Sequence, residues 1–120
     1  MPSTRLAEME VVDQLKFSFT NAASAGNQDL IGAPGVGFKI VIYGYSINAS
    51  GGANTVFFTR GTGPTPLCSQ KGLGASAGSN MPPGEFFLHE CAENEKLGIT
   101  LSAATNVGVD VWYALQRVTP

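Results

Sequence analysis

The stretch "KIVIYGYSINASGGANTVFF", residues 39–58, decides the fold class. Two runs rich in β-branched and aromatic residues flank a glycine turn, which predicts two antiparallel strands joined by a hairpin loop. In the first run Ile40 and Ile42 share one face, but beyond Gly44 the large residue Tyr45 falls on the opposite parity. A β-bulge near Gly44 restores a single inward-facing set, because it adds one residue and glycine tolerates the unusual backbone.

The same stretch carries more apolar side chains than one small core can accept. With the bulge in place, Val41 and Tyr43 still face outward. Burying a large apolar side chain stabilises by roughly 1.5–3 kcal/mol, so several left outside favour association. The alternative is that these residues close the ends of the fold or lie beneath long loops. We predict an oligomer or partner interface that comprises Val41, Tyr43, Phe57, Phe87 and Trp112.

Alternating patterns outside this stretch predict further strands. In "QLKFSFT", residues 14–20, Leu15, Phe17 and Phe19 are expected on the buried face. "KLGITLS" and "VGVDVWYALQRV" alternate in the same way, and the second run places Trp112 on the face away from the core. Glycine and proline punctuation between residues 61 and 91 indicates three shorter strands.

Seven to eight short antiparallel strands predict an all-β protein. The expected fold is a single-domain β-sandwich of jelly-roll or related Greek-key type. A chain of 120 residues suits one domain, which we assign to residues 14–120. Residues 1–13 are expected to form an N-terminal arm that is ordered only where a neighbour holds it.

Composition narrows the classes of partner. Charged residues make up 13% of the chain and the net charge is −2, so no basic surface for nucleic acid is expected. No run of about eighteen apolar residues and no signal-peptide pattern is present, so we expect neither a membrane segment nor Sec-type export. Cys68 and Cys91 are then expected as two free thiols, with a disulfide between them as the less favoured alternative.

The chain offers no recognisable catalytic set. His89 is the single histidine, and it stands in the acidic run "HECAENE". Such residue types can ligate a metal, but no second Cys/His cluster completes a site within one chain. The glycine-rich segments "GAPGVG" and "GLGASAG" lack the spacing of phosphate-binding loops. We therefore expect no enzyme, no catalytic residue, no metal and no cofactor. A third possibility is an enzyme with a metal assembled between chains near His89.

Two segments, residues 19–69 and 84–115, resemble a group of small phage-encoded virion proteins. The resemblance lies in a loop that ends in glycine before a long strand, a second strand after a glycine turn, and two alternating strands at the end. It is carried by Lys39, Ile40, Ile42, Gly44, Tyr45, Val56, Phe58, Asn94, Leu97, Ile99, Leu101, Ser102, Ala104, Val107, Gly108, Val111 and Tyr113. The run "HECAENE" departs from the less acidic turn usual in that group.

The resemblance implies a capsid decoration or cement protein, typically a β-sandwich trimer seated on the shell. We therefore expect a homo-oligomer, a trimer by resemblance, bound to the major capsid protein of a phage head. Its location would be the outer capsid surface of the virion after synthesis in the host cytoplasm. The alternative is a receptor- or glycan-binding tip of a head or tail fibre, in which Tyr43, Tyr45 or Trp112 would stack on the ligand.

Overall fold

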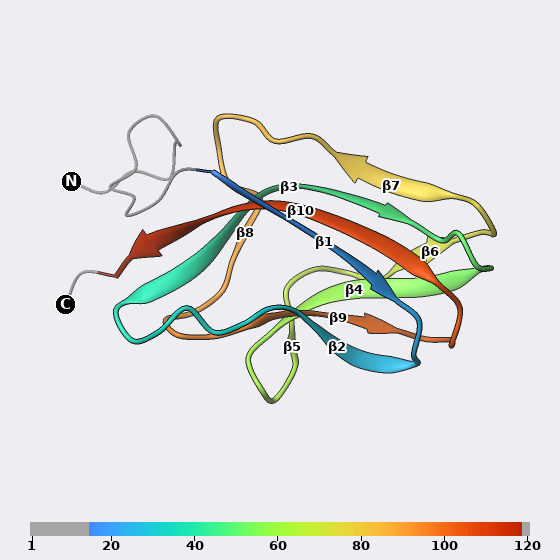
Figure 1. The fold of residues 1–120 in the computed structure, drawn as a ribbon, viewed down its shortest axis with the longest axis horizontal. Coiled ribbons are helices and arrows are strands. Elements are labelled where there is room, and N and C mark those ends of the chain that lie inside the picture. Colours follow the sequence, from blue (N-terminus) through green and yellow to red (C-terminus); the bar gives the residue numbers. More distant parts are fainter. Residues whose placement is uncertain (1–14, 119–120) are drawn as a thin grey trace.

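Two antiparallel sheets face each other across one hydrophobic core in the computed structural model of this protein, which describes residues 15–118 (Figure 1). The arm expected at residues 1–13 lies outside the described residues. Within residues 15–118 there is no helical residue, and hence no helix that could cross a membrane. The strands of this part of the chain are β1 (Lys16–Ala22), β2 (Gly26–Ile31), β3 (Phe38–Asn48), β4 (Asn54–Arg60), β5 (Thr65–Pro66), β6 (Lys71–Leu73), β7 (Gly78–Met81), β8 (His89–Glu90), β9 (Leu97–Leu101) and β10 (Val107–Arg117).

The strand order is that of a jelly roll, which confirms the predicted fold class. One sheet has the order β1-β10-β3-β7, and the other has the order β2-β9-β4-β5. β8 pairs with β3 on the edge that β7 also uses, and β6 shares an edge of β4 with β5. If β5 and β6 are counted as one interrupted strand, and β7 and β8 as another, eight strands remain. In chain order, the first of these neighbours the eighth, the second the seventh, the third the sixth and the fourth the fifth. That order is a long antiparallel ribbon rolled up into two sheets.

The bulge predicted near Gly44 is present in β3. Trp112 of β10 lies opposite Gly44, while the next residue, Tyr113, lies opposite Ile42, so Tyr43 is the extra residue. The bulge turns both halves of β3 toward the core, as the slipped alternation required. The apolar side chains buried between the sheets come chiefly from β3, β4, β9 and β10, and include Ile40, Ile42, Tyr45, Ile47, Val56, Phe58, Leu97, Ile99, Leu101, Val107, Val109 and Val111.

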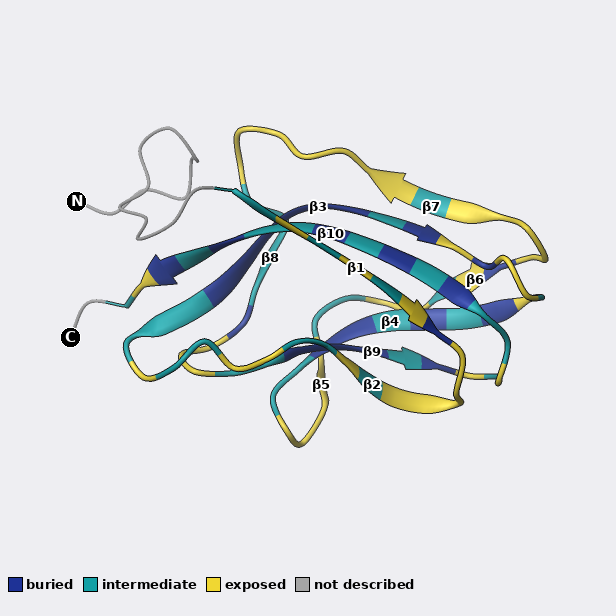
Figure 2. Ribbon diagram, viewed as in Figure 1, coloured by how far each residue is buried: buried dark blue, intermediate teal, exposed yellow. Residues whose placement is uncertain are grey.

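The prediction that Phe17 and Phe19 lie on the buried face of β1 is wrong. Phe17 and Phe19 are exposed, whereas Ser18 and the other even-numbered residues of the strand face inward (Figure 2). The cause is the pairing with β10, which puts Phe17 opposite Trp112 and Ser18 opposite Val111. Residues paired across a sheet lie on the same face, and Val111 belongs to the core. The two phenylalanines must therefore share the outer face with Trp112.

Candidate interaction surface

Three aromatic side chains form a patch on the outer face of the β1-β10-β3-β7 sheet. The aromatic patch consists of Phe17, Phe19 and Trp112. The ring centroids of Phe17 and Trp112 lie 5.2 Å apart with planes inclined by 50°, and those of Phe17 and Phe19 lie 6.1 Å apart. Phe17 is 50% exposed and Phe19 is 74% exposed. Contiguous exposed aromatic patches of this kind are more frequent at interaction sites than on the rest of protein surfaces.

A shallow apolar hollow of about 420 Å³ adjoins the patch at Trp112. Pro82 and Pro83, which follow β7, line the hollow together with Trp112. Two polar residues, Ser46 and Asn80, line it as well, but the Ser46 hydroxyl donates a 2.5 Å hydrogen bond to Asn80 Oδ1. The surface offered to a ligand is therefore mostly apolar, which suits an aliphatic or aromatic group.

The interface predicted from the sequence is only partly exposed. Val41 and Tyr43 do point away from the main core, as predicted, but both are buried inside this chain. They form a second small cluster with Ala114, against which Leu15 and Phe87 pack. Burial raises the pKa of the Tyr43 hydroxyl above its ordinary value. Within this chain Val41 and Tyr43 therefore offer almost no surface to a partner.

The remaining predicted interface residues do not form one surface. Trp112 and the partly buried Phe87 belong to the outer side of the sheet that contains β3. Phe57 lies in β4 of the other sheet, opposite Thr100, and is half-buried. Its neighbour Phe58 is buried in the core, so these two residues face opposite ways as predicted. The sequence interpretation missed Phe17 and Phe19, which are the most exposed members of the patch.

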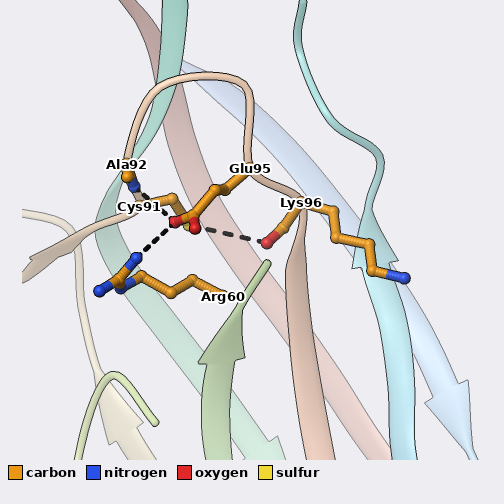
Figure 3. A network of polar contacts seen from close by, with 5 residues as sticks. All are labelled: Arg60, Cys91, Ala92, Glu95 and Lys96. Atoms are coloured by element: carbon orange, nitrogen blue, oxygen red, sulfur yellow. Dashed lines mark hydrogen bonds and ion pairs between the residues drawn. The ribbon is translucent and has the colours of Figure 1, made fainter. Parts of the chain in front are cut away.

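The acidic run at residues 89–95 serves as a structural connection. Glu95 accepts hydrogen bonds from Arg60 Nη1 at 2.7 Å and from the Ala92 amide at 2.9 Å (Figure 3). Burial alone would raise the pKa of Glu95, but these hydrogen bonds and the charge of Arg60 outweigh it and lower the pKa. Glu90 forms an ion pair with Lys39. Both carboxylates thus connect the loop to neighbouring strands.

The same run also fixes the turn before β3. Glu93 Oε2 accepts the amide of Gly37 at 2.8 Å, and Asn94 Oδ1 accepts the amide of Gly35 at 2.9 Å. The Asn94 amide donates to the carbonyl of Phe38 at 2.8 Å, and Asn94 adopts a positive φ of 55°, which asparagine tolerates well. Glu93 and Asn94 therefore add side-chain hydrogen bonds to a glycine-rich turn that backbone hydrogen bonds also hold, from Phe38 to Gly35 at 3.2 Å and from Val118 to Gly37 at 2.8 Å.

His89, Cys68 and Cys91 are residue types that can ligate a metal or act as nucleophiles. Residues 15–118 contain no group of three or more His, Cys, Asp or Glu side chains that could hold a metal. Partial burial, followed by the charge of Lys71, lowers the pKa of His89, which favours its neutral form. Cys68 and Cys91 are both free thiols. Burial and the neighbouring Glu95 raise the pKa of Cys91 to about 12, so its reactive thiolate is scarce at neutral pH.

Comparisons with known proteins give no assignment. No family model matches this chain, and no curated protein matches its sequence. One similar solved structure is a chain from Bacillus endospore appendages, described as a novel family of disulfide-linked pili; it is 13% identical, with a TM-score of 0.47 and 88% of each chain covered. Another belongs to the cyanophage Pam1 capsid asymmetric unit; it is 17% identical, with a TM-score of 0.47, 95% of this chain covered and 99% of the other. Similarity at this level carries no conclusion about function.

Proposed function

We propose that this protein is a non-enzymatic capsid decoration protein of a phage head. It forms a homo-oligomer, a trimer by resemblance, and binds the major capsid protein lattice on the outer capsid surface. The observation that carries the proposal is the aromatic patch of Phe17, Phe19 and Trp112 on the outer face of a jelly-roll sheet. The sequence resemblance to phage virion proteins, which extends through most of the sandwich, supports the location on a capsid.

The patch favours adhesion over chemistry. Aromatic side chains contribute large apolar areas with little conformational entropy to lose, which is why they are enriched at protein interfaces. The polar clusters of the described residues are occupied in holding the fold: Glu90, Glu93 and Glu95 bind neighbouring strands and turns. The aromatic patch, in contrast, leaves apolar area exposed on the outer face, which suits attachment to a partner.

Attachment of this kind stabilises the assembled shell by mass action. A ligand that binds the assembled state and not the free subunits lowers the free energy of the assembled state, by about 2.7 kcal/mol per site at a concentration one hundred times its Kd. The effect is repeated at every site on a lattice. The protein therefore needs no strong single contact to strengthen a particle.

The direct test compares particles that lack the protein with the same particles after purified protein is added back. Genome release is followed during heating and during dilution into low salt. We expect decorated particles to retain the genome to a higher temperature and at lower salt. Equal resistance of decorated and undecorated particles would contradict the proposed function.

A second candidate is a glycan- or receptor-binding tip, favoured by the hollow beside Trp112. An indole next to the polar side chains of Ser46 and Asn80 is a suitable setting for a sugar ring. The mutual hydrogen bond of Ser46 and Asn80 and the two prolines leave few polar groups for sugar hydroxyls, which weighs against it. A glycan array with wild-type protein and a Trp112→Ala variant separates the two: specific signal lost in the variant favours the tip, and absence of signal favours decoration.

A further inference from the structure

The four sheet edges seen in residues 15–118 differ in how well they are protected. An exposed edge strand presents unpaired backbone groups to which another strand can add, and proteins usually interrupt or charge such edges. The β5/β6 edge and the β7/β8 edge are each broken into short pieces. The β2 edge is polar, and its Asp29 forms an ion pair with Lys96 at 2.9 Å.

The β1 edge is the least protected of the four, since its single charged residue, Lys16, stands at the very start of the strand. β1 is a continuous strand of seven residues, and among the described strands it pairs only with β10. Its outer face carries Phe17 and Phe19, the two exposed phenylalanines of the aromatic patch. A continuous edge with exposed aromatic side chains is the arrangement to which a further strand adds most readily.

We propose that β1 pairs antiparallel with β1 of a second copy about a two-fold axis, with Ser18 of one chain opposite Ser18 of the other. The two β1-β10-β3-β7 sheets then join into one continuous sheet. This contact gives the outer face on which the proposed function rests a partner, which is a second copy of the chain. It requires only self-association and no capsid.

The β1 sequence is self-complementary in this register. Phe17 lies opposite Phe19 of the second copy and Phe19 opposite its Phe17, so every aromatic side chain of the strand meets another on the same face. Cross-strand aromatic pairs are favourable, and like charges placed directly opposite are not. Lys16 lies opposite Thr20 of the second copy rather than opposite its Lys16. Registers centred on Phe17 or Phe19 leave one phenylalanine opposite a non-aromatic residue.

The area available makes this contact weak on its own. Aromatic side chains bury about 150–250 Å² each. With Phe17 and Phe19 at 50% and 74% exposure, the two rings offer roughly 250 Å² per copy, against about 800 Å² per partner in a standard interface. A two-fold contact also cannot close a trimer. It instead links one oligomer to its neighbour, where repeated weak contacts on a lattice reinforce one another.

The first test is sedimentation equilibrium of purified full-length protein over a concentration series. Wild type is expected to shift toward higher mass through two-fold association as concentration rises. Phe19→Lys places a charge in the pairing and is expected to weaken the association at least tenfold. Val36→Lys is the matched control, because Val36 is 79% exposed and lies outside β1; it should associate like wild type. Wild type that stays at one mass at every concentration, or Phe19→Lys that associates equally well, would overturn the proposal.

The second test fixes the register by disulfide trapping in a Cys68→Ser background. Ser18→Cys places two thiols opposite each other and should give a covalent dimer on mild oxidation. Asn21→Cys is the control: it is exposed on the same strand, but the two copies of residue 21 lie six positions apart in this register, roughly 20 Å, too far for a disulfide. Equal cross-linking of the two variants, or none with Ser18→Cys, would refute the register.

These results are separable from the proposed function. Association that depends on Phe19 without any gain in particle resistance would support the strand pairing and contradict decoration. Particles protected equally by wild type and Phe19→Lys, with no concentration-dependent association of wild-type oligomers with one another, would support decoration and contradict the pairing.

Discussion

Pro83 lies directly on Gly44. A Cβ atom at Gly44 would come within 2.6 Å of the Pro83 nitrogen and 2.8 Å of its Cα, closer than such atoms ever approach. The segment after β7 therefore crosses the outer face of β3 at the one position of the bulge region that has no side chain. The same segment leads to Phe87, which packs on the cluster of Tyr43 and Val41.

Gly44→Ala is expected to destabilise the protein by about 1–3 kcal/mol, the usual cost of forcing an extra methyl group into a packed site. The methyl group would push the Pro83 backbone off the sheet and expose Tyr43. Chemical denaturation followed by Trp112 fluorescence measures the change. Gly72→Ala in β6 is the matched control, because a Cβ there meets nothing within 4 Å; equal unfolding free energies for the two variants would argue against the close approach.

Asn54 joins the start of β4 to the loop between β9 and β10, and its removal should be costly. The side chain is 5% exposed, and Oδ1 accepts the amides of Ser102 and Ala103 at 3.0 and 3.2 Å. Nδ2 donates to the Ala103 carbonyl and the Thr105 hydroxyl, both at 2.9 Å. Asn54→Ala removes these four hydrogen bonds; the Ser102 amide and the Thr105 hydroxyl keep contacts to the carbonyls of Thr55 and Ala53, but the Ala103 amide loses its hydrogen bond to Oδ1. The variant should lower the free energy of unfolding by about 1–3 kcal/mol.

The control for Asn54 is Asn106, whose side chain donates a solvent-exposed hydrogen bond of 2.7 Å to the Ser50 hydroxyl. Water replaces an exposed partner, so Asn106→Ala should cost less than about 1 kcal/mol. Urea denaturation of both variants at neutral pH provides the comparison. A cost for Asn54→Ala no larger than that for Asn106→Ala would mean that the network does not stabilise the loop.

The sequence was sufficient to predict the architecture because the pattern and the packing agree along β3, β9 and β10. The slip in alternation at Gly44 predicted the bulge, and the structure places the extra residue at Tyr43. Phe57 and Phe58 were separated correctly by strand period alone. In each case the inward side chains are apolar and the strand lies in the middle of a sheet, where both faces are defined by neighbours.

The candidate surface was harder to predict, because it depends on contacts between distant segments. In β1 the rule that the apolar face is the buried face failed, since register with β10 fixed the orientation and left Phe17 and Phe19 outside. The available signal for this surface in the sequence was the alternation of β10, which places the large apolar side chain of Trp112 on the outer face. The covering of Val41 and Tyr43 depends on the path of the segment after β7, which strand periodicity does not encode.

Glu95 should make stability depend on pH. Its pKa in the folded protein is below the ordinary value of 4.5, so its contribution is complete above that pH and is lost as pH falls through the lower, folded-state pKa. Glu95→Gln is therefore expected to lower the thermal midpoint at pH 7 and to lose this difference from wild type as the solution becomes more acidic. Thermal unfolding between pH 7 and pH 2.5 measures the convergence.

Asp29→Asn serves as the control for Glu95, since its ion pair with Lys96 is formed by a carboxylate side chain that is 61% exposed. Exposed pairs of this kind contribute little, so the midpoint should stay near that of wild type throughout the range. If the thermal midpoint of Glu95→Gln lies below that of wild type by the same amount at every pH, then packing, and not the charge of the carboxylate, accounts for the loss of stability.

The two thiols should differ in reactivity. Cys91 is 2% exposed with a pKa raised to about 12, whereas Cys68 is partly exposed. Iodoacetamide at pH 8 is therefore expected to alkylate Cys68 in the native protein and to leave Cys91 unmodified over the same period, because alkylation needs an accessible thiolate. Mass spectrometry of peptides identifies the site, and labelling in denaturant should reach both residues. Rapid native labelling of Cys91, or protection of both residues until a reductant is added, would contradict a buried thiol beside a free one.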